Sequence, residues 1–295
     1  MGPIEKRPCA CTGVRWCARC RDHAVRRRFR MDDPVPMPEF LASPPADPAQ
    51  ADPNRLIHPF EACSQSAPSC PEFHGLRLYP NFLSEKEASV LLGTLEETPF
   101  VPAQSGKGKQ HYGPKINFNK RKMNARNFAG IPSYARDLET RMRSWIGKDS
   151  TLTPKERGEI DSALSTYQTT DVFVLRYRPE ESSNLDFHLD DPVAYGELIL
   201  DLSLESDSVL TFLRGRPNSE LGERASAIDT PTCIRVPLPA RSLAVLYGPA
   251  RFDWEHAILA YDIGAQRTSV TLRTLGDSFR ETEEGRSVLE RAGRS

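Results

Sequence analysis

The sequence predicts an α+β domain whose core is an antiparallel β-sandwich of the jelly-roll type, a double-stranded β-helix flanked by helices. Helical patterns come first in the folded part of the chain, between residues 84 and 167. Short strand-like runs follow from residue 171 onward. Helices and strands that are segregated along the chain are typical of α+β domains, and a series of short strands favours a sandwich.

The first 30 residues are a cysteine-rich segment that ends in a basic run. Its thiols are Cys9, Cys11, Cys17 and Cys20. Four thiolates this close together suit one structural zinc ion, and basic neighbours favour the thiolate form. The alternative is that these cysteines are reduced and unstructured. The run from Arg26 to Arg30 is a solvated charge run or, alternatively, a patch for nuclear localisation or anion binding.

Residues 31–72 are expected to form a linker, because they are rich in proline and contain too few apolar residues to fold. The folded domain is expected over residues 73–281, with a C-terminal tail over 282–295. At 295 residues, the chain is long enough for one such domain and an appendage.

Three helices are predicted in the first half of the domain. Ser84 and Glu87 form a capping-box pattern at the start of the first helix. Apolar residues at helical spacing follow this box: Ala88, Leu91, Leu92 and Leu95. The second helix is expected over 133–146 and the third, with a poorer pattern, over 154–167.

A basic segment lies between the first two helices. From Val101 to Arg126 it contains seven Lys or Arg residues and no Asp or Glu. We expect a solvated surface loop or, in the functional interpretation, a lid that covers a substrate, because loops over a rigid scaffold often carry specificity.

The second half of the domain reads as strands, over 172–177, 198–204, 209–213 and 242–247. Several of these strands lie between His188 and His256, so the chain can fold back and return the second histidine beside the first.

His188, Asp190 and His256 are the candidate metal ligands. Two imidazoles and one carboxylate form the facial triad that binds Fe(II) and leaves positions open for oxygen and a co-substrate. Taken singly, His188 and Asp190 fit a surface turn and His256 fits a structural histidine. Their order and spacing favour the metal site.

A final strand predicts an anion site. Arg267, Ser269, Thr271 and Arg273 alternate with apolar residues, so these four side chains share one face. Two arginines on one inward face need an anion nearby, and their planar forks suit a dicarboxylate. Together with the three candidate metal ligands, this pattern predicts an iron and 2-oxoglutarate dependent dioxygenase.

Composition excludes some classes of protein. The net charge of −1 gives no global signature of a nucleic-acid or membrane-surface binder. We find no apolar run near the roughly 20 residues that span a bilayer, and no secretory signal. A location in the cytoplasm and nucleus is therefore expected, with no membrane partner.

Over residues 73–280 the sequence resembles the AlkB family of dioxygenases, in particular its fourth-homologue subgroup. The stretches that carry the resemblance are Gln104-Ser105-Gly106-Lys107, Tyr112-Gly113-Pro114-Lys115-Ile116-Asn117-Phe118, His188-Leu189-Asp190-Asp191, Val236-Pro237-Leu238-Pro239-Ala240-Arg241-Ser242-Leu243 and Trp254-Glu255-His256-Ala257-Ile258. The N-terminal cysteine pattern is also similar to that subgroup.

The resemblance implies roles for individual residues. His188, Asp190 and His256 would bind iron, and Arg267 would bind the distal carboxylate of 2-oxoglutarate. Arg273 would lie near the keto-acid end, and Tyr177 and Ser269 would line the same co-substrate site. Leu175 and Ser269 stand where relatives that repair nucleic acid have asparagine, which argues against a plain repair enzyme.

The resemblance implies oxidative N-demethylation, and three hypotheses follow from it. The first substrate is a methyl-lysine of a protein such as actin, with effects on actomyosin. The second is N6-methyladenine in nucleic acid, so DNA is an alternative partner. The third hypothesis is a protein that binds actomyosin or chromatin and does not need its oxygenase site.

Overall fold

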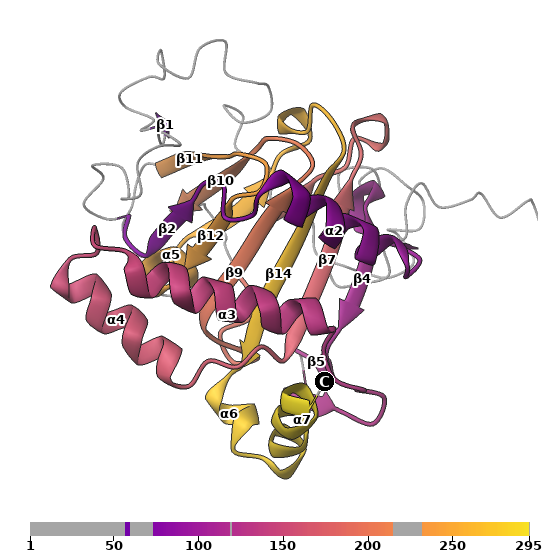
Figure 1. The fold of residues 1–295 in the computed structure, drawn as a ribbon, viewed down its shortest axis with the longest axis vertical. Helices are drawn as coiled ribbons and strands as arrows, with labels where there is room; N and C mark the ends of the chain where they lie inside the picture. The colour runs from indigo at the N-terminus through magenta and orange to yellow at the C-terminus, as the bar shows by residue number, and fades with distance from the viewer. Residues whose placement is uncertain (1–56, 60–72, 119, 215–231, 295) are drawn as a thin grey trace, which may run out of the picture.

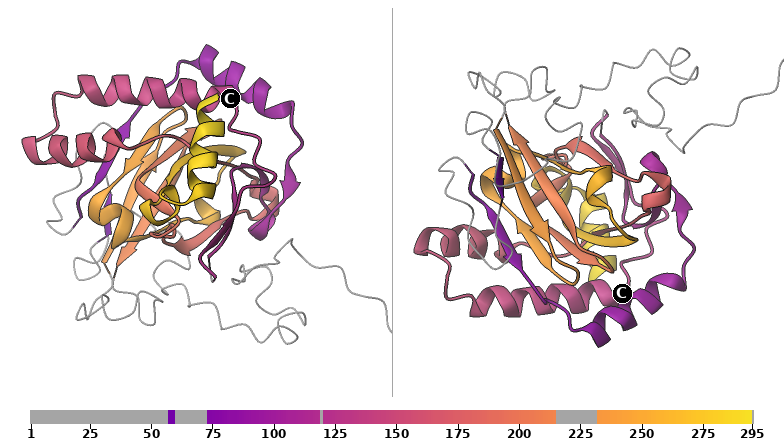
Figure 2. Two further views of the ribbon diagram at one scale, coloured as in Figure 1. Left: turned by 90° about the horizontal axis from the view of Figure 1, so that it is seen from below. Right: turned by 90° about the horizontal axis from the view of Figure 1, so that it is seen from above.

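The computed structural model describes residues 57–59, 73–118, 120–214 and 232–294. The cysteine-rich segment and most of the predicted linker lie outside these ranges, so the proposed zinc ligands are not described. Two β-sheets share one hydrophobic core, and helices cover the outer face of the larger sheet (Figures 1 and 2). The predicted jelly-roll fold is confirmed.

The larger sheet carries most of the core. Its strands, in spatial order, are β2 (Leu76–Tyr79), β12 (Leu243–Leu246), β9 (Tyr195–Leu204), β14 (Arg267–Leu275), β7 (Asp171–Tyr177), β4 (Gly108–Tyr112) and β3 (Val101–Pro102). Strand β14 lies between β9 and β7 and is antiparallel to both. This central position buries both faces of β14, which is why its polar side chains must find partners inside the fold.

The smaller sheet holds the two predicted metal-binding histidines. Its strands, in spatial order, are β1 (Ile57–Pro59), β11 (Thr232–Leu238), β10 (Ser208–Arg214), β13 (Glu255–Ile258) and β8 (Leu185–His188). Strands β8 and β13 are antiparallel neighbours. Segments far apart in sequence therefore meet at this edge of the sandwich.

The helices pack on the larger sheet and at its lower end in Figure 1. They are α2 (Glu85–Glu96), α3 (Ser133–Lys148), α4 (Pro154–Ser165), α5 (Gly248–Phe252), α6 (Asp277–Arg280) and α7 (Glu283–Arg294). The capping box predicted at Ser84 and Glu87 is confirmed, and Thr153 and Glu156 form a second one before α4. Helix α3 buries Leu138, Met142 and Ile146 in the shared core.

The structure differs from the sequence analysis in three places. The basic segment is not simply a loop, because its first part forms β3 and β4 in the larger sheet. Its second part is a separate hairpin of β5 (Lys115–Asn117) and β6 (Lys122–Asn124). The segment expected as a C-terminal tail forms α7, and strand β2 precedes the first helix. No helix within the described ranges could cross a membrane.

Candidate metal centre and co-substrate pocket

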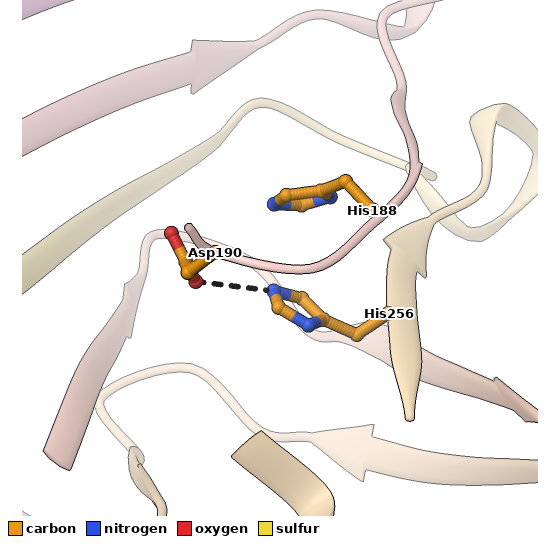
Figure 3. Close-up of side chains that lie close together, drawn as sticks. All are labelled: His188, Asp190 and His256. Carbon is orange, nitrogen blue, oxygen red and sulfur yellow. Dashed lines mark ion pairs between the residues drawn. The ribbon is translucent and has the colours of Figure 1, made fainter. Parts of the chain in front are cut away.

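His188 and His256 lie side by side because they are a cross-strand pair. They are directly opposite in the register of β8 and β13, and their ring centroids are 4.4 Å apart. Asp190 follows β8 by two residues and turns back toward both rings, as Figure 3 shows. Ligand atoms of all three residues lie within 4.8 Å of one another. The structure thus brings together the three residues that the sequence analysis selected.

A hydrogen bond to the backbone indicates which nitrogen of the His188 ring is free to bind a metal. Nδ1 of His188 lies 2.9 Å from the backbone carbonyl of Asp186. A carbonyl can only accept, so Nδ1 carries the proton and the lone pair is on Nε2. His256 Nε2 lies 3.7 Å from Asp190 Oδ2, while its Nδ1 has no hydrogen-bond partner among the described residues.

Burial and neighbouring charges set the protonation of the group. Burial, with a smaller contribution from His188, lowers the pKa of His256 to about 3, although Asp190 raises it, so the ring is neutral at physiological pH. Burial would raise the pKa of Asp190, but Arg273 and the two histidines outweigh it and hold the pKa well below its usual range. Neutral imidazoles and an ionised carboxylate are the forms that bind a metal.

The donor set fits Fe(II). Two imidazoles and one carboxylate in reach of one point are the protein ligands of non-haem iron oxygenases, and they leave coordination positions open. The group is also largely shielded from water, since His256 and Asp190 are buried. Such shielding strengthens electrostatic interactions at the site.

Two arginines hold Asp190 from opposite ends. Arg273 Nη2 lies 2.8 Å from Asp190 Oδ1, and Arg251 Nη1 donates to the Asp190 backbone carbonyl at 2.7 Å. Arg251 is 1 % exposed and reaches the carbonyls of Asp191 and Tyr195 as well. The loop that carries the carboxylate is therefore fixed by its side chain and by its backbone.

Arg267, the arginine predicted for the co-substrate, lies in a buried polar cluster at the other end of β14. Its side chain is buried and donates to Ser203 Oγ at 3.0 Å and to Asp201 Oδ2 at 3.2 Å. The guanidinium lies 5.1 Å from the ring centre of Tyr177, its cross-strand partner. Nη1 has no hydrogen-bond partner among the described residues. An unsatisfied buried cationic donor of this kind fits a ligand carboxylate.

The other two residues predicted for the co-substrate site, Tyr177 and Ser269, lie beside Arg267. Burial raises the pKa of Tyr177 to about 12, although the Arg267 charge lowers it, so the phenol keeps its proton. Ser269 is buried on β14, one pleat along from Arg267, and also faces Tyr177. Arg267, Tyr177 and Ser269 thus form one polar cluster inside the sandwich.

The sequence analysis missed Asp201, Asp171 and Arg251. The first two are the carboxylates that pair with the arginines of β14. Asp201 had a usable signal, because it is a single acid between Leu200 and Leu202 in a strand-like run. Arg251 lies in a short helical turn with no recognisable pattern, so only the folded structure identifies its role.

The chain is similar in sequence to a known family and to individual known proteins. Residues 75–286 match the model of the 2OG-Fe(II) oxygenase superfamily. The chain is 32 % identical to the human protein named alpha-ketoglutarate-dependent dioxygenase alkB homolog 4, over 97 % of this chain and 94 % of that protein. The mouse protein of the same name is 30 % identical over 75 % of each chain.

The name of a nematode relative indicates a different activity. The Caenorhabditis elegans protein named DNA N6-methyl adenine demethylase is 29 % identical, over 99 % of this chain and 94 % of that protein. The similarity to both kinds of relative spans nearly the whole length of this chain.

Proposed function

This chain belongs to the 2OG-Fe(II) oxygenase superfamily and, within it, to the AlkB family, and we propose that its substrate is an N-methylated lysine of a protein such as actin. It is a 2-oxoglutarate-dependent dioxygenase of a demethylase family. The cluster of His188, Asp190 and His256 supports oxidative demethylation, because this donor set suits Fe(II); the choice of a protein substrate has the separate support given below.

We propose that these three residues hold Fe(II) and that Arg267, with Tyr177 and Ser269, holds the distal carboxylate of 2-oxoglutarate. When bound, iron and 2-oxoglutarate supply the oxidising power that hydroxylates an N-methyl carbon. Oxygen and 2-oxoglutarate are consumed, and succinate and carbon dioxide are released. The N-hydroxymethyl product then breaks its C–N bond and gives formaldehyde and the demethylated amine.

The protein residues contribute orientation, protonation state and exclusion of water. His256 stays neutral and Asp190 stays ionised, so neither ligand has to change its proton before the metal binds. The carbonyl of Asp186 orients the His188 ring. Arg273 is already paired with two carboxylates, so we propose that Arg267 is the principal arginine for the co-substrate.

The β5–β6 hairpin supports an acidic macromolecular substrate. Its Phe118 is 48 % exposed and lies 6.4 Å, ring to ring, from Tyr195, whose ring contacts Arg273. The exposed cations of the hairpin are Lys115, Lys120, Arg121 and Lys122. A basic hairpin near the site can dock an acidic protein surface by charge complementarity.

N6-methyladenine in DNA is the second candidate substrate. The nematode relative carries that activity in its name, and a basic hairpin also suits phosphate groups. We favour the protein substrate because the resemblance is to the actin-linked subgroup and because Leu175 and Ser269 depart from the repair pattern.

One experiment separates the two substrates. Methyl-lysine actin and N6-methyladenine DNA are given to the same preparation, and formaldehyde release is measured with the His188→Ala variant as control. We expect turnover on actin. Turnover on DNA alone, lost when Lys120, Arg121 and Lys122 are neutralised, would reverse the ranking.

The sequence supports two further proposals. Cys9, Cys11, Cys17 and Cys20 bind a structural zinc ion, and the basic run that follows them supports a nuclear as well as a cytoplasmic location.

A further inference from the structure

We infer that Asp171, held by His111, is a positioning residue that fixes the guanidinium of Arg273 beside the proposed metal ligand Asp190. The inference rests on the proposed function, since it takes Asp190 as a ligand. It concerns a pair of residues that lies away from the three candidate ligands, on strands β7 and β4 of the larger sheet.

Arg273 is shared between two carboxylates. Its Nη1 donates to Asp171 Oδ1 at 3.0 Å, and its Nη2 lies 2.8 Å from Asp190 Oδ1. The guanidinium also lies 4.8 Å from the ring centre of Tyr195. Each end of the planar fork thus has its own anion, and rotation of the guanidinium would break one of the two contacts.

Asp171 is placed for this role by strand pairing. It stands directly opposite Arg273 in the register of β7 and β14, and its side chain is 2 % exposed. Its second oxygen, Oδ2, lies 2.6 Å from Nε2 of His111, which comes from the neighbouring strand β4. The His111 side chain is 33 % exposed and packs edge-on against Phe173. A chain of polar contacts therefore runs from the surface to Asp190.

Gly113 leaves room for the pair. A Cβ atom at this position would lie 2.3 Å from Asp171 Oδ2 and 2.9 Å from His111 Nε2, and real Cβ atoms do not come that close. The motif Tyr112-Gly113-Pro114 therefore has a structural explanation: any larger residue at its centre would push the histidine and the carboxylate apart.

The contact between Asp171 and Arg273 has its largest effect when a metal ion binds to Asp190. An arginine whose only anion was Asp190 would compete with the metal for that carboxylate. Asp171 gives Arg273 a second carboxylate partner, so that Asp190 can bind a cation while Arg273 keeps its position. Residues that orient a ligand in this way typically change metal affinity about 10–100-fold when they are removed.

The test measures metal affinity without turnover. Mn(II), a redox-stable stand-in for Fe(II), is titrated calorimetrically into the full-length chain under anaerobic conditions, and thermal unfolding is recorded for every variant. The variants are Asp171→Asn, which removes the charge, Asp171→Glu, which keeps it, and His111→Gln. Asp262→Asn is the matched control, because Asp262 is another buried partner of an arginine, at 2.5 Å from Arg235 on the other sheet.

We expect Asp171→Asn to weaken Mn(II) binding about 10-fold or more. His111→Gln should weaken it less, Asp171→Glu should recover part of the loss, and Asp262→Asn should bind as the wild type does. If Asp171→Asn does not fold, Mn(II) binding by His111→Gln tests the proposal, because the His111 side chain is partly exposed.

Two results contradict different claims. If the wild type binds Mn(II), His188→Ala does not, and both His111→Gln and every folded Asp171 variant bind as the wild type does, then the positioning role is wrong and the metal site stands. If His188→Ala binds as well as the wild type, the metal site itself is wrong.

Discussion

Arg273 and Asp190 form an ion pair inside the sandwich, with Arg273 Nη2 2.8 Å from Asp190 Oδ1 and both side chains largely shielded from water. Arg273 comes from the centre of the larger sheet and Asp190 from the loop beyond β8 in the smaller one. The pair therefore connects the proposed metal centre to the sheet that carries Arg267, the arginine proposed to bind the co-substrate.

Loss of the Arg273 charge should destabilise the fold. Arg273→Gln would leave Asp171 and Asp190 buried and facing each other without a cation, and breaking a buried ion pair costs about 3–5 kcal/mol. Denaturant unfolding at pH 7 measures the change. Arg141→Gln is the control, because its pair with Glu87 is half-exposed and should contribute less than about 1 kcal/mol. Equal effects of the two variants would contradict the role of the buried pair.

Arg267→Lys should weaken 2-oxoglutarate binding and leave metal binding unchanged. Lysine keeps the charge but cannot donate to Ser203, Asp201 and a ligand carboxylate with one planar fork. Loss of a charged hydrogen bond of about 1.5–3 kcal/mol corresponds to roughly 10–100-fold in affinity. Calorimetric titration of the Mn(II)-loaded protein with 2-oxoglutarate tests this. An unchanged affinity would mean that the orphaned Nη1 does not face the co-substrate.

Phe118→Ala should impair the use of the macromolecular substrate only. The side chain is exposed on the basic hairpin and lies next to Tyr195 at the site. We expect KM for the methylated substrate to rise several-fold, while the slow decarboxylation of 2-oxoglutarate without substrate stays as in the wild type. Val90→Ala, at another exposed apolar residue, on helix α2, is the control for a general surface effect. A similar rise in KM for both variants would show that the hairpin has no specific role in substrate recognition.

Acid should destabilise the protein in part through Asp149. Burial would raise the pKa of this carboxyl, but hydrogen bonds from Thr151 and the charge of Arg77 hold it below the ordinary value. A lowered folded-state pKa contributes stability that is present above about pH 4, the unfolded-state value, and is lost as the pH falls through the folded value.

The Asp149→Asn variant isolates that contribution. It should be less stable than the wild type at pH 7 and should lose less stability between pH 7 and pH 3. Chemical unfolding at a series of pH values gives both quantities. A wild-type slope in the variant would show that Asp149 does not titrate as described.

The cysteine segment gives a prediction from sequence alone. Purified full-length protein should contain zinc at one equivalent under reducing conditions, because we propose that the four thiolates of Cys9, Cys11, Cys17 and Cys20 bind one zinc ion. Elemental analysis of the wild type and of a variant with serine at all four positions decides it. Equal zinc content in the two proteins counts against the site.

The sequence predicted much of the fold because its signals are local. The capping box at Ser84 and the alternation along β14 each depend on neighbouring residues, and both were found in the structure. The meeting of His188 and His256 followed from the number of strands between them.

What the sequence did not reveal depends on contacts between distant strands. Nothing near Asp171 indicates that it will face Arg273, 102 residues further along the chain. Strand β4 could not be distinguished from a loop, because its buried positions are Gly108 and Gln110 and not the apolar residues of a period-two pattern. Which carboxylate pairs with which arginine of β14 likewise depends on the register of β7, β9 and β14.

Formation of succinate from 2-oxoglutarate, in the presence of Fe(II), oxygen and methylated substrate, tests directly whether His188, Asp190 and His256 form the metal centre. Wild-type protein and His188→Ala are compared side by side, with unfolding curves to show that both are folded. We expect oxygen-dependent succinate formation by the wild type and none above background by the variant. Equal succinate formation by the two proteins would contradict the assignment of His188, Asp190 and His256 as the metal centre.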